Sequence, residues 1–569
     1  MMKAANSLIE SSLPMRPPEQ VMNLKRLGSL HQSRLSFMRT LIRKIMREKW
    51  VIKPTVFDLD KHGYGTVVYT VQAKHNTYSF VLFSNFISDE ERDDRVIAEK
   101  WDLTMTLCIG EVDDEQIADM KENVPKQEAG RVNSNMMVLS RGNKSSRNFE
   151  YVVNQLAKGH QPLMSKLADV GYLYRTTAAY GSGKFGMADW AKVKSQCPDF
   201  ARPFSAEMFS CYILRQFSID QAENLAKIKS PETAVSMDDS VKRFIGIGNS
   251  TGLGMAPYLI RHPKLVSQWM LVRETAVSRV VNLGEVNQAT LDQLDNIMTK
   301  VLQHISETNV PDVVQIKRNE SLFNELTQVQ KWLLVDGIKC SDWRVLVEYA
   351  VAHYSMETQE MINSLLMELY PELVDDLEEE LCVDESYEMQ PEMSLYALKQ
   401  VIENNYGWAL DIDFSQLGTE HFFWYRSKEK MEPRLGQRLV ELGEENAMPL
   451  TIARLVRHCY DRLCVDIEKH SANDSVAYFL IRESNMSGIV KRIQTMSKDY
   501  YGEIQGNLAD ENMLPLDLLR CKLSFFGVSK FDPKSKLWVR NTMFQGAPIL
   551  SDIGKPFNDD WYFPIATDN

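Results

Sequence analysis

The sequence lacks the features that mark membrane, secreted and disulfide-stapled proteins. It has no run of about 18 apolar residues, and its first residues lack the basic-then-apolar pattern of a secretory signal. The eight cysteines are scattered and include no CxxC pair, so neither a disulfide framework nor a thiolate metal site is indicated. We therefore expect a cytoplasmic protein without a bound metal.

Positive charge is also in short supply. The formal net charge is −12, which disfavours nucleic acid or an anionic membrane surface as the main partner. The exception is a basic segment near the N-terminus that holds Lys25, Arg26, Arg34, Arg39, Arg43, Lys44, Arg47 and Lys49. An apolar stripe through Met38, Leu41 and Ile45 favours a docked helix with a solvated basic face over a nucleic-acid or membrane patch.

The familiar catalytic signatures are missing as well. We find no Gly-x-Ser-x-Gly elbow, HExxH helix, EF-hand loop, kinase motif set or complete dinucleotide fingerprint. Asp58 and Asp60 form an Asp-x-Asp pair that could ligate a metal, although turn residues are the favoured interpretation. No nucleophile, general base or cofactor can therefore be named.

The sequence does contain short patterns that occur twice, in the same order and at nearly constant separation. The matched pairs are Asp58 and Asp60 with Asp411 and Asp413, Leu139 and Arg141 with Leu480 and Arg482, and Gly181 and Lys184 with Gly527 and Lys530. Such an ordered set indicates internal duplication. Hairpin, helix and strand signals in the first copy predict counterparts in the second, with a hairpin over residues 408–425 and a strand over 518–526. We expect an α+β fold of two duplicated α+β lobes related by a pseudo-twofold axis.

A large helical insert is predicted between the lobes. Helical periodicity marks residues 206–228, 264–282, 288–307, 322–334 and 358–369. The acidic run over residues 375–380 is typical of a solvated connector. The predicted organisation is an N-terminal helical arm (1–36), a first α+β lobe (37–200), an all-helical insert (201–390) and a second α+β lobe (391–569).

One glycine-rich segment of the insert, residues 246–254, resembles a ligand-binding turn more than a helix. Glycines let a ligand approach the backbone, and a helix that opens near Pro257 would present free N–H groups to a phosphate or carboxylate. The side chains of Asn249, Ser250 and Thr251 add hydrogen-bonding groups. The segment is neither a phosphate-binding P-loop nor a dinucleotide fingerprint. The alternative is a tight helix–helix junction.

Three basic residues could supply charge to this turn. Arg141 follows a predicted strand and precedes a helix, where it could bind an anion or pair with a carboxylate between the lobes. Lys184 follows a glycine turn and could contact a phosphate or point into water. Arg273, on the helix after the glycine-rich segment, could face the ligand or form a buried helix–helix ion pair.

These patterns together predict a cytosolic metabolic enzyme that acts on a small phosphate- or carboxylate-bearing substrate, bound between the first lobe and the glycine-rich turn. The expected binding residues are Arg141, Lys184, Asn249, Ser250, Thr251, Gly252, Gly254 and Arg273. A lyase or transferase is favoured over an oxidoreductase, and a homo-oligomer is compatible with the sequence. The alternatives are a non-catalytic assembly or regulatory protein that docks through the insert, and a nucleotide-dependent enzyme with an atypical phosphate loop.

Overall fold

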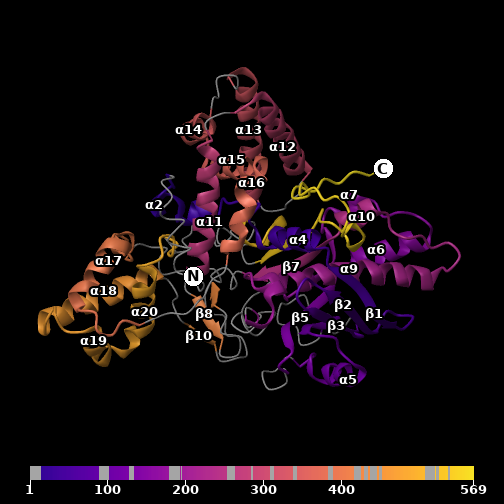
Figure 1. Ribbon diagram of the computed structural model, residues 1–569, viewed down its shortest axis with the longest axis horizontal. Helices are drawn as coiled ribbons and strands as arrows, with labels where there is room; N and C mark the ends of the chain where they lie inside the picture. Colours follow the sequence, from indigo (N-terminus) through magenta and orange to yellow (C-terminus); the bar gives the residue numbers. More distant parts are fainter. Residues whose placement is uncertain are drawn as a thin grey trace.

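The computed structural model has a mixed α+β fold, in which a central sheet is surrounded by helices (Figure 1). It describes residues 14–88, 101–126, 133–178, 193, 195–252, 263–283, 286–307, 313–336, 342–381, 389–415, 424–427, 433–435, 445–447, 452–505, 520, 524–535 and 538–568. No helix in these ranges is long and apolar enough to cross a membrane.

Nine strands form the central sheet, in the order β1-β2-β3-β4-β5-β6-β7-β12-β11. They are β1 (Val51–Leu59), β2 (Gly65–Gln72), β3 (Thr77–Ser84), β4 (Leu103–Ile109), β5 (Met136–Lys144), β6 (Tyr172–Thr176), β7 (Gly246–Gly252), β11 (Val528–Ser535) and β12 (Trp538–Met543). Strands β6 and β7 pair in parallel, and the other neighbouring pairs are antiparallel. The hairpin predicted around Asp60 is confirmed as β1–β2, and Asp60 accepts hydrogen bonds from the turn amides of His62 and Tyr64.

The middle of the sheet is covered on both faces. Strand β3 reads Thr-Tyr-Ser-Phe-Val-Leu-Phe-Ser, and this near-continuous apolar run is typical of a strand without a solvated face. Its Phe80 belongs to the main core, whereas Val81 packs into a smaller core with Met120 of α5 (Asp114–Asn123). The helices α6 (Ser146–Ala157) and α9 (Ser205–Lys229) cover the opposite face, and α9 supplies fully buried side chains such as Leu214 and Phe217. Burial of each such side chain stabilises the fold by about 1.5–3 kcal/mol.

Most of the remaining helices stand at one end of the sheet, at the top of Figure 1. They are α11 (Pro263–Val281), α12 (Gln288–Glu307), α13 (Val313–Asp336), α14 (Trp343–His353), α15 (Met356–Leu369) and α16 (Pro371–Val374). The helix α10 (Asp239–Phe244) lies beside the sheet instead, near α6. The predicted insert helices are confirmed, but α13 begins well before residue 322. Its first turn exposes Val313, Val314 and Ile316, so the apolar residues there follow no single buried face and the sequence periodicity missed them.

The N-terminal arm is docked by buried ion pairs. It contains α2 (Pro18–Val21), α3 (Leu24–Leu27) and α4 (Phe37–Glu48). The docked helix is confirmed, but the solvated basic face is wrong. Arg39 is fully buried between Glu368 and Asp559, and Arg43 binds Glu378 of the short 3-10 helix η7 (Asp375–Glu380). The acidic run is therefore only partly solvated: Arg34 and Arg43, more than 300 positions away in the chain, pair with Asp375 and Glu378, whereas Asp376 and Glu379 are exposed.

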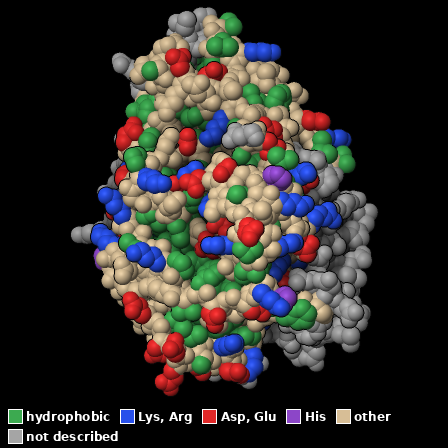
Figure 2. Space-filling view, turned by 90° about the vertical axis from the view of Figure 1, so that its right-hand side faces the viewer, with side chains coloured by type: hydrophobic (Ala, Val, Ile, Leu, Met, Phe, Trp, Pro, Cys, Tyr) green, Lys and Arg blue, Asp and Glu red, His purple; other side chains and the backbone are tan. Residues whose placement is uncertain are grey.

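A second helical group stands apart from the sheet, at the left of Figure 1. It comprises α17 (Leu395–Leu410), α18 (Ile452–Lys469), α19 (Val476–Arg482) and α20 (Ser487–Met496). A small sheet of β8 (Trp424–Ser427), β9 (Pro433–Leu435) and β10 (Glu445–Ala447) lies between this group and the central sheet (Figure 1). On the face shown in Figure 2, acidic and basic side chains are interspersed, and hydrophobic side chains gather near its middle.

The predicted duplication does not extend to the secondary structure. Residues 139–141 lie in strand β5, whereas the matching residues 480–482 end helix α19. The second hairpin was expected to begin at Trp408, but residues 408–410 are the last turn of α17. The strand predicted over 518–526 contains a helical turn at Ser524 and Phe525. Duplicated lobes and a pseudo-twofold axis are thus not shown, because patterns of three or four residues do not specify a hydrophobic period.

The insert is not all-helical either. Gly246–Gly252 forms β7, which lies between β6 of the predicted first lobe and β12 of the predicted second lobe. The strands of the central sheet therefore come from three of the four predicted segments. The glycine-rich segment, predicted to be a turn over residues 246–254, forms a strand from Gly246 to Gly252.

Candidate functional site

Two of the predicted binding residues lie close together on the central sheet. Asn249 of β7 donates its side-chain N–H to the carbonyl oxygen of Thr176 at 2.9 Å. Thr176 in turn donates its hydroxyl to the carbonyl oxygen of Arg141 in β5 at 3.0 Å. Because neighbouring strands lie about 4.8 Å apart, Arg141 and Asn249 are separated by roughly 10 Å at the backbone.

Arg141 lies among buried polar groups. Its guanidinium carbon is 5.5 Å from the ring centroid of Trp101, and burial lowers the pKa of Arg141 to about 10. Thr104 is the cross-strand neighbour of Arg141 in β4. Within the described structure, the buried Trp101 Nε1 and Thr104 Oγ1 have no hydrogen-bond partner. A buried polar group left in this way costs about 1–3 kcal/mol, which a polar ligand could recover.

A further buried amide extends this arrangement across the sheet. Asn541 of β12 is directly opposite Asn249, and its side chain is 1% exposed. In the part of the chain that the structure describes, neither its amide oxygen nor its amide nitrogen has a partner. We call the set of Trp101, Thr104, Arg141, Asn249 and Asn541 the polar row. Thr176 joins these residues through hydrogen bonds of its hydroxyl and backbone, although its pairing with Gly142 places its side chain on the opposite face from that of Arg141.

As far as Gly252, the segment predicted to form a backbone cradle for an anion is a strand. Ser250, Thr251 and Gly252 belong to β7 and are in register with β12, so they are strand residues and not a loop before a helix. Ser250 lies opposite Arg540, and Thr251 lies opposite Val539. Their backbone groups lie in the antiparallel ladder that pairs β7 with β12.

The first two glycines of this segment have a packing role. A Cβ atom at Gly246 would lie 2.5 Å from the carbonyl oxygen of Met543, and one at Gly248 would lie 2.5 Å from the ring of Tyr172. Glycine is needed there because neighbouring strands and a tyrosine ring approach the backbone closely. The sequence reasoning attributed the same requirement to a ligand.

Two predicted residues, Lys184 and Gly254, lie outside the described residues. The chain leads toward them from the carboxyl ends of β6 and β7, which form the parallel pair of the sheet. Carboxyl ends of parallel strands are the usual place for ligands in open sheets.

Arg273 does not belong to the polar row. It is fully buried on α11, where it contacts Glu274 at 2.7 Å and Glu360 of α15 at 2.6 Å. Glu360 also accepts hydrogen bonds from Arg16 and Arg26 of the N-terminal arm. Burial alone would raise the pKa of Glu360, but Arg16 and Arg273 hold it well below its usual range. The alternative interpretation of Arg273, a buried helix–helix ion pair, is confirmed, and a ligand-binding role for it stays a prediction.

The two basic residues matched to Arg141 and Lys184 also have structural partners. Arg482 forms an ion pair with Asp466 at 2.5 Å, so it pairs with a carboxylate of the fold, as one of the two interpretations of its counterpart Arg141 predicts. Lys530 donates to the carbonyl oxygens of Ala168 and Asp169, at the end of the short helix α7 (Met164–Leu167). A cation at a helix C-terminus neutralises the carbonyls left without partners there.

Sequence reasoning missed a cavity of about 640 Å³ on the face of the sheet that α6 and α9 cover, here called the Lys144 cavity. Its lining comprises Tyr64, Phe86, Ile87, Ser88, Lys144, Ser146, Phe149, Glu150, Val153, Asn154, Leu225 and Lys229. The start of a helix at Ser146 was a usable signal, and Lys144 stands two residues before it. Arg141 was predicted to be the cation near this helix, but alternation along β5 places its side chain on the opposite face from Lys144.

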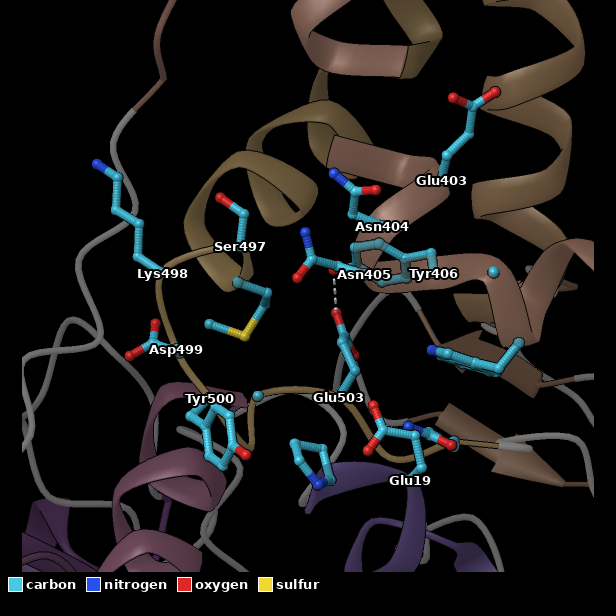
Figure 3. Close-up of a pocket in the computed structure, with 16 residues that line it drawn as sticks. Glu19, Glu403, Asn404, Asn405, Tyr406, Ser497, Lys498, Asp499, Tyr500 and Glu503 are labelled. Carbon is cyan, nitrogen blue, oxygen red and sulfur yellow. Dashed lines mark hydrogen bonds between the residues drawn. The ribbon is translucent and has the colours of Figure 1, made fainter. Parts of the chain in front are cut away.

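A second cavity, of about 450 Å³, lies where α17 meets the chain after α20 (Figure 3). Its lining includes Glu19, Glu403, Asp499 and Glu503 but only one basic residue. The backbone of α17 departs from helical geometry at Tyr406, whose hydroxyl donates to Glu503 at 2.8 Å (Figure 3). This acidic cavity does not suit the anionic ligand that the sequence predicts. Among the described residues, no group of three His, Cys, Asp or Glu side chains could hold a metal ion.

No protein family, curated protein or solved structure matches this chain. The assignment of a site therefore depends on the geometry and chemistry of the residues themselves.

Proposed function

We propose that the polar row binds a small phosphate- or carboxylate-bearing molecule and that the protein acts on it as a cytoplasmic metabolic enzyme. The observation that carries this proposal is the pair of buried groups without partners, Trp101 Nε1 and Thr104 Oγ1, next to the guanidinium of Arg141.

The chemistry of these groups favours an anion over a neutral ligand. A guanidinium, an indole N–H and a hydroxyl are all hydrogen-bond donors, and two of the three are unused in the described structure. Burial lowers the pKa of Arg141 to about 10 because it disfavours the charged guanidinium. A bound carboxylate or phosphate would accept from these donors and would restore the ordinary pKa of Arg141.

Other predicted residues border the row. Ser250, Thr251 and Gly252 follow Asn249 along β7 toward its carboxyl end. Lys184 and Gly254 remain predictions. The cytoplasmic part of the proposal is supported by five of the eight cysteines, Cys108, Cys197, Cys211, Cys459 and Cys464, which lie in the described part of the chain and form no disulfide there. The described site supplies no nucleophile, so the preference for a lyase or transferase also remains a prediction.

The proposal is tested by thermal shift with a panel of small anions: inorganic phosphate, sugar phosphates, and di- and tricarboxylic acids. We expect one chemical class to raise the melting temperature of the native protein. Arg141→Met should weaken binding of that class about 10- to 100-fold, because a charge-assisted hydrogen bond contributes about 1.5–3 kcal/mol. Arg47→Met is the matched control, because Arg47 is an exposed arginine on α4. No shift from any compound, or equal shifts in Arg141→Met and the native protein, would refute the anion site.

The enzymatic part needs its own measurement. A compound that raises the melting temperature is incubated with the protein and followed by NMR. Conversion that disappears in Arg141→Met supports an enzyme, whereas an unchanged compound limits the polar row to binding.

The alternative of a non-catalytic assembly protein has a smaller observation in its favour. At the end of α13, Leu334 and Val335 are 73% and 75% exposed. Two exposed side chains do not identify a partner, so this alternative is an outcome of the same experiments. The absence of any ligand shift together with a stable complex in pull-downs would favour it.

A further inference from the structure

We propose that the Lys144 cavity is a second binding site, independent of the polar row, and that it takes a nucleoside phosphate. Its size, its charge and its aromatic lining each point to a phosphate joined to a planar ring.

The size and construction of the cavity fit such a ligand. Its volume of about 640 Å³ lies inside the range of about 300–1,000 Å³ that small-molecule sites occupy. Four separate segments form its walls: the turn between β1 and β2, the residues after β3, the junction of β5 with α6, and the last turns of α9. A wall drawn from four segments is set by the fold as a whole and not by one mobile loop.

Its charge favours a phosphate. Lys144 enters from the end of β5 and Lys229 enters from α9, while Glu150 is the one acidic residue in the lining. Lys229 donates to the side-chain oxygen of Asn154 at 2.6 Å, which holds its ammonium group against α6. Two ammonium groups from different elements suit a group that carries more than one negative charge.

The start of α6 adds to this charge. The helix begins at Ser146, its first turn contains no acidic residue, and the side chain of the N-cap residue Ser145 makes no capping hydrogen bond. The first N–H groups of a helix have no partners within it, and the helix dipole places partial positive charge there. With Ser146 in the lining, these N–H groups add to the attraction that the two lysines exert on a phosphate.

The aromatic residues fit the ring of the ligand. The Nζ atom of Lys144 is 5.0 Å from the ring centroid of Phe149 and 5.6 Å from that of Tyr64, so its ammonium group is placed between two rings. Phe86 is 68% exposed, and its ring meets that of Tyr64 at 82° with centroids 5.6 Å apart. A large exposed aromatic side chain at the mouth of a charged cavity offers a nucleobase a surface for stacking, worth about 1–3 kcal/mol per base.

The Lys144 cavity is separate from the polar row. Lys144 is the cross-strand neighbour of Tyr174, whose hydroxyl donates to Gln221 of α9, so both side chains are on the face that α9 covers. Arg141 is three positions earlier in β5 and points to the other face. Substitutions in one site should therefore leave ligand binding at the other unchanged.

The test is isothermal titration of the full chain with AMP, ADP, GMP and UMP, with inorganic phosphate and adenosine as half-ligands. We expect at least one nucleotide to bind more tightly than either half-ligand. Lys144→Met and Lys229→Met should each weaken nucleotide binding about 5- to 20-fold. Phe86→Ala should weaken binding of nucleotide and adenosine but not of phosphate, and its exposure means that folding is unaffected.

Lys227→Met is the control, because Lys227 is an exposed lysine on α9 outside the lining. Arg141→Met separates this site from the proposed function, since it should leave nucleotide affinity unchanged. The proposal is overturned if none of the nucleotides binds at millimolar concentration. It is also overturned if nucleotide affinity survives Lys144→Met and Phe86→Ala, both confirmed as folded by circular dichroism.

Discussion

The fully buried Arg39 and the half-buried Arg141 have different surroundings in this protein. In the ion-pair network that docks the N-terminal arm, burial alone would lower the pKa of Arg39, but Asp559 and Glu368 raise it well above its ordinary value. On the central sheet, burial lowers the pKa of Arg141 to about 10. The opposite directions show that carboxylates outweigh burial at Arg39, whereas burial is the larger influence on the pKa of Arg141.

A lowered pKa is not enough to identify a ligand site. Burial also lowers the pKa of Arg215 to about 10, yet that guanidinium donates to five backbone carbonyl oxygens, including those of Ile245 and Pro548. Its role in joining α9 to the chain before β7 and after β12 is structural. Arg141 differs because the neighbouring Trp101 and Thr104 have unused hydrogen-bonding atoms. A ligand site is therefore indicated by the unused hydrogen-bonding atoms beside an arginine, and not by its lowered pKa alone.

The largest effect is expected from the centre of the network. Glu360→Ala would leave Arg16, Arg26 and Arg273 buried without their shared carboxylate. Removing one partner of a buried ion pair costs about 3–5 kcal/mol, so the urea midpoint of unfolding should fall sharply. Glu320→Ala, at an exposed position of α13, is the control. A loss below about 1 kcal/mol would contradict the structural role of the network.

Acid should reveal the next largest effect, through His31. Its Nε2 atom is 3.4 Å from Glu357, but burial lowers the pKa of His31 to about 4, so the imidazole is neutral in the folded protein at pH 7. The unfolded chain takes up this proton near pH 6.5, and the folded protein does so only near pH 4. The free energy of unfolding should therefore fall by roughly 2 kcal/mol between pH 6.5 and 4.5.

Above pH 4.5, the pH dependence of the free energy of unfolding reports His31 separately from the ion-pair network. The pKa of Glu360 is depressed in the fold, so its contribution is lost only as pH falls below about 4.5, where the unfolded chain binds the proton. Chemical denaturation across this pH range measures both contributions. His31→Asn should flatten the upper part of the curve, and a slope that persists in this variant would assign it to other groups.

The smallest effect on stability is expected at Arg141. Arg141→Met removes a charge that burial disfavours, so the free energy of unfolding should change by less than about 1 kcal/mol or should rise. Arg39→Met, which strands Glu368 and Asp559 inside the protein, should lower it by several times that amount. Similar losses in the two variants, measured by urea unfolding, would place Arg141 in a structural network and remove the basis of the comparison.

Sequence reasoning succeeded where the signal is local. The helices α4, α9 and α12 and the hairpin of β1 and β2 follow from apolar spacing and turn residues within a few positions of one another. It failed for the predicted second lobe, where short similarities such as Arg141 with Arg482 were read as a shared fold. One of these residues lies in a strand and the other at the end of a helix.

The candidate site was predicted in part. Arg141 and Asn249 were chosen for their chemistry, and the sheet brings them together through Thr176. Trp101, Thr104 and Asn541 were missed because a single buried polar residue in an apolar strand carries no pattern. The glycines at 246 and 248 were misread, since a close approach by a tyrosine ring and a close approach by a ligand require the same residue.

The sequence by itself determined the local elements of this protein, since spacing of apolar residues specifies a helix or a strand without reference to the rest of the chain. Only the tertiary structure decided which strands share a sheet and which charges meet. Arg39 finds its carboxylates at Glu368 and Asp559, and Lys144 meets Lys229 across a cavity. Such pairings depend on three-dimensional proximity between distant parts of the chain. They decide which charges pair within the fold and which lie together in a cavity.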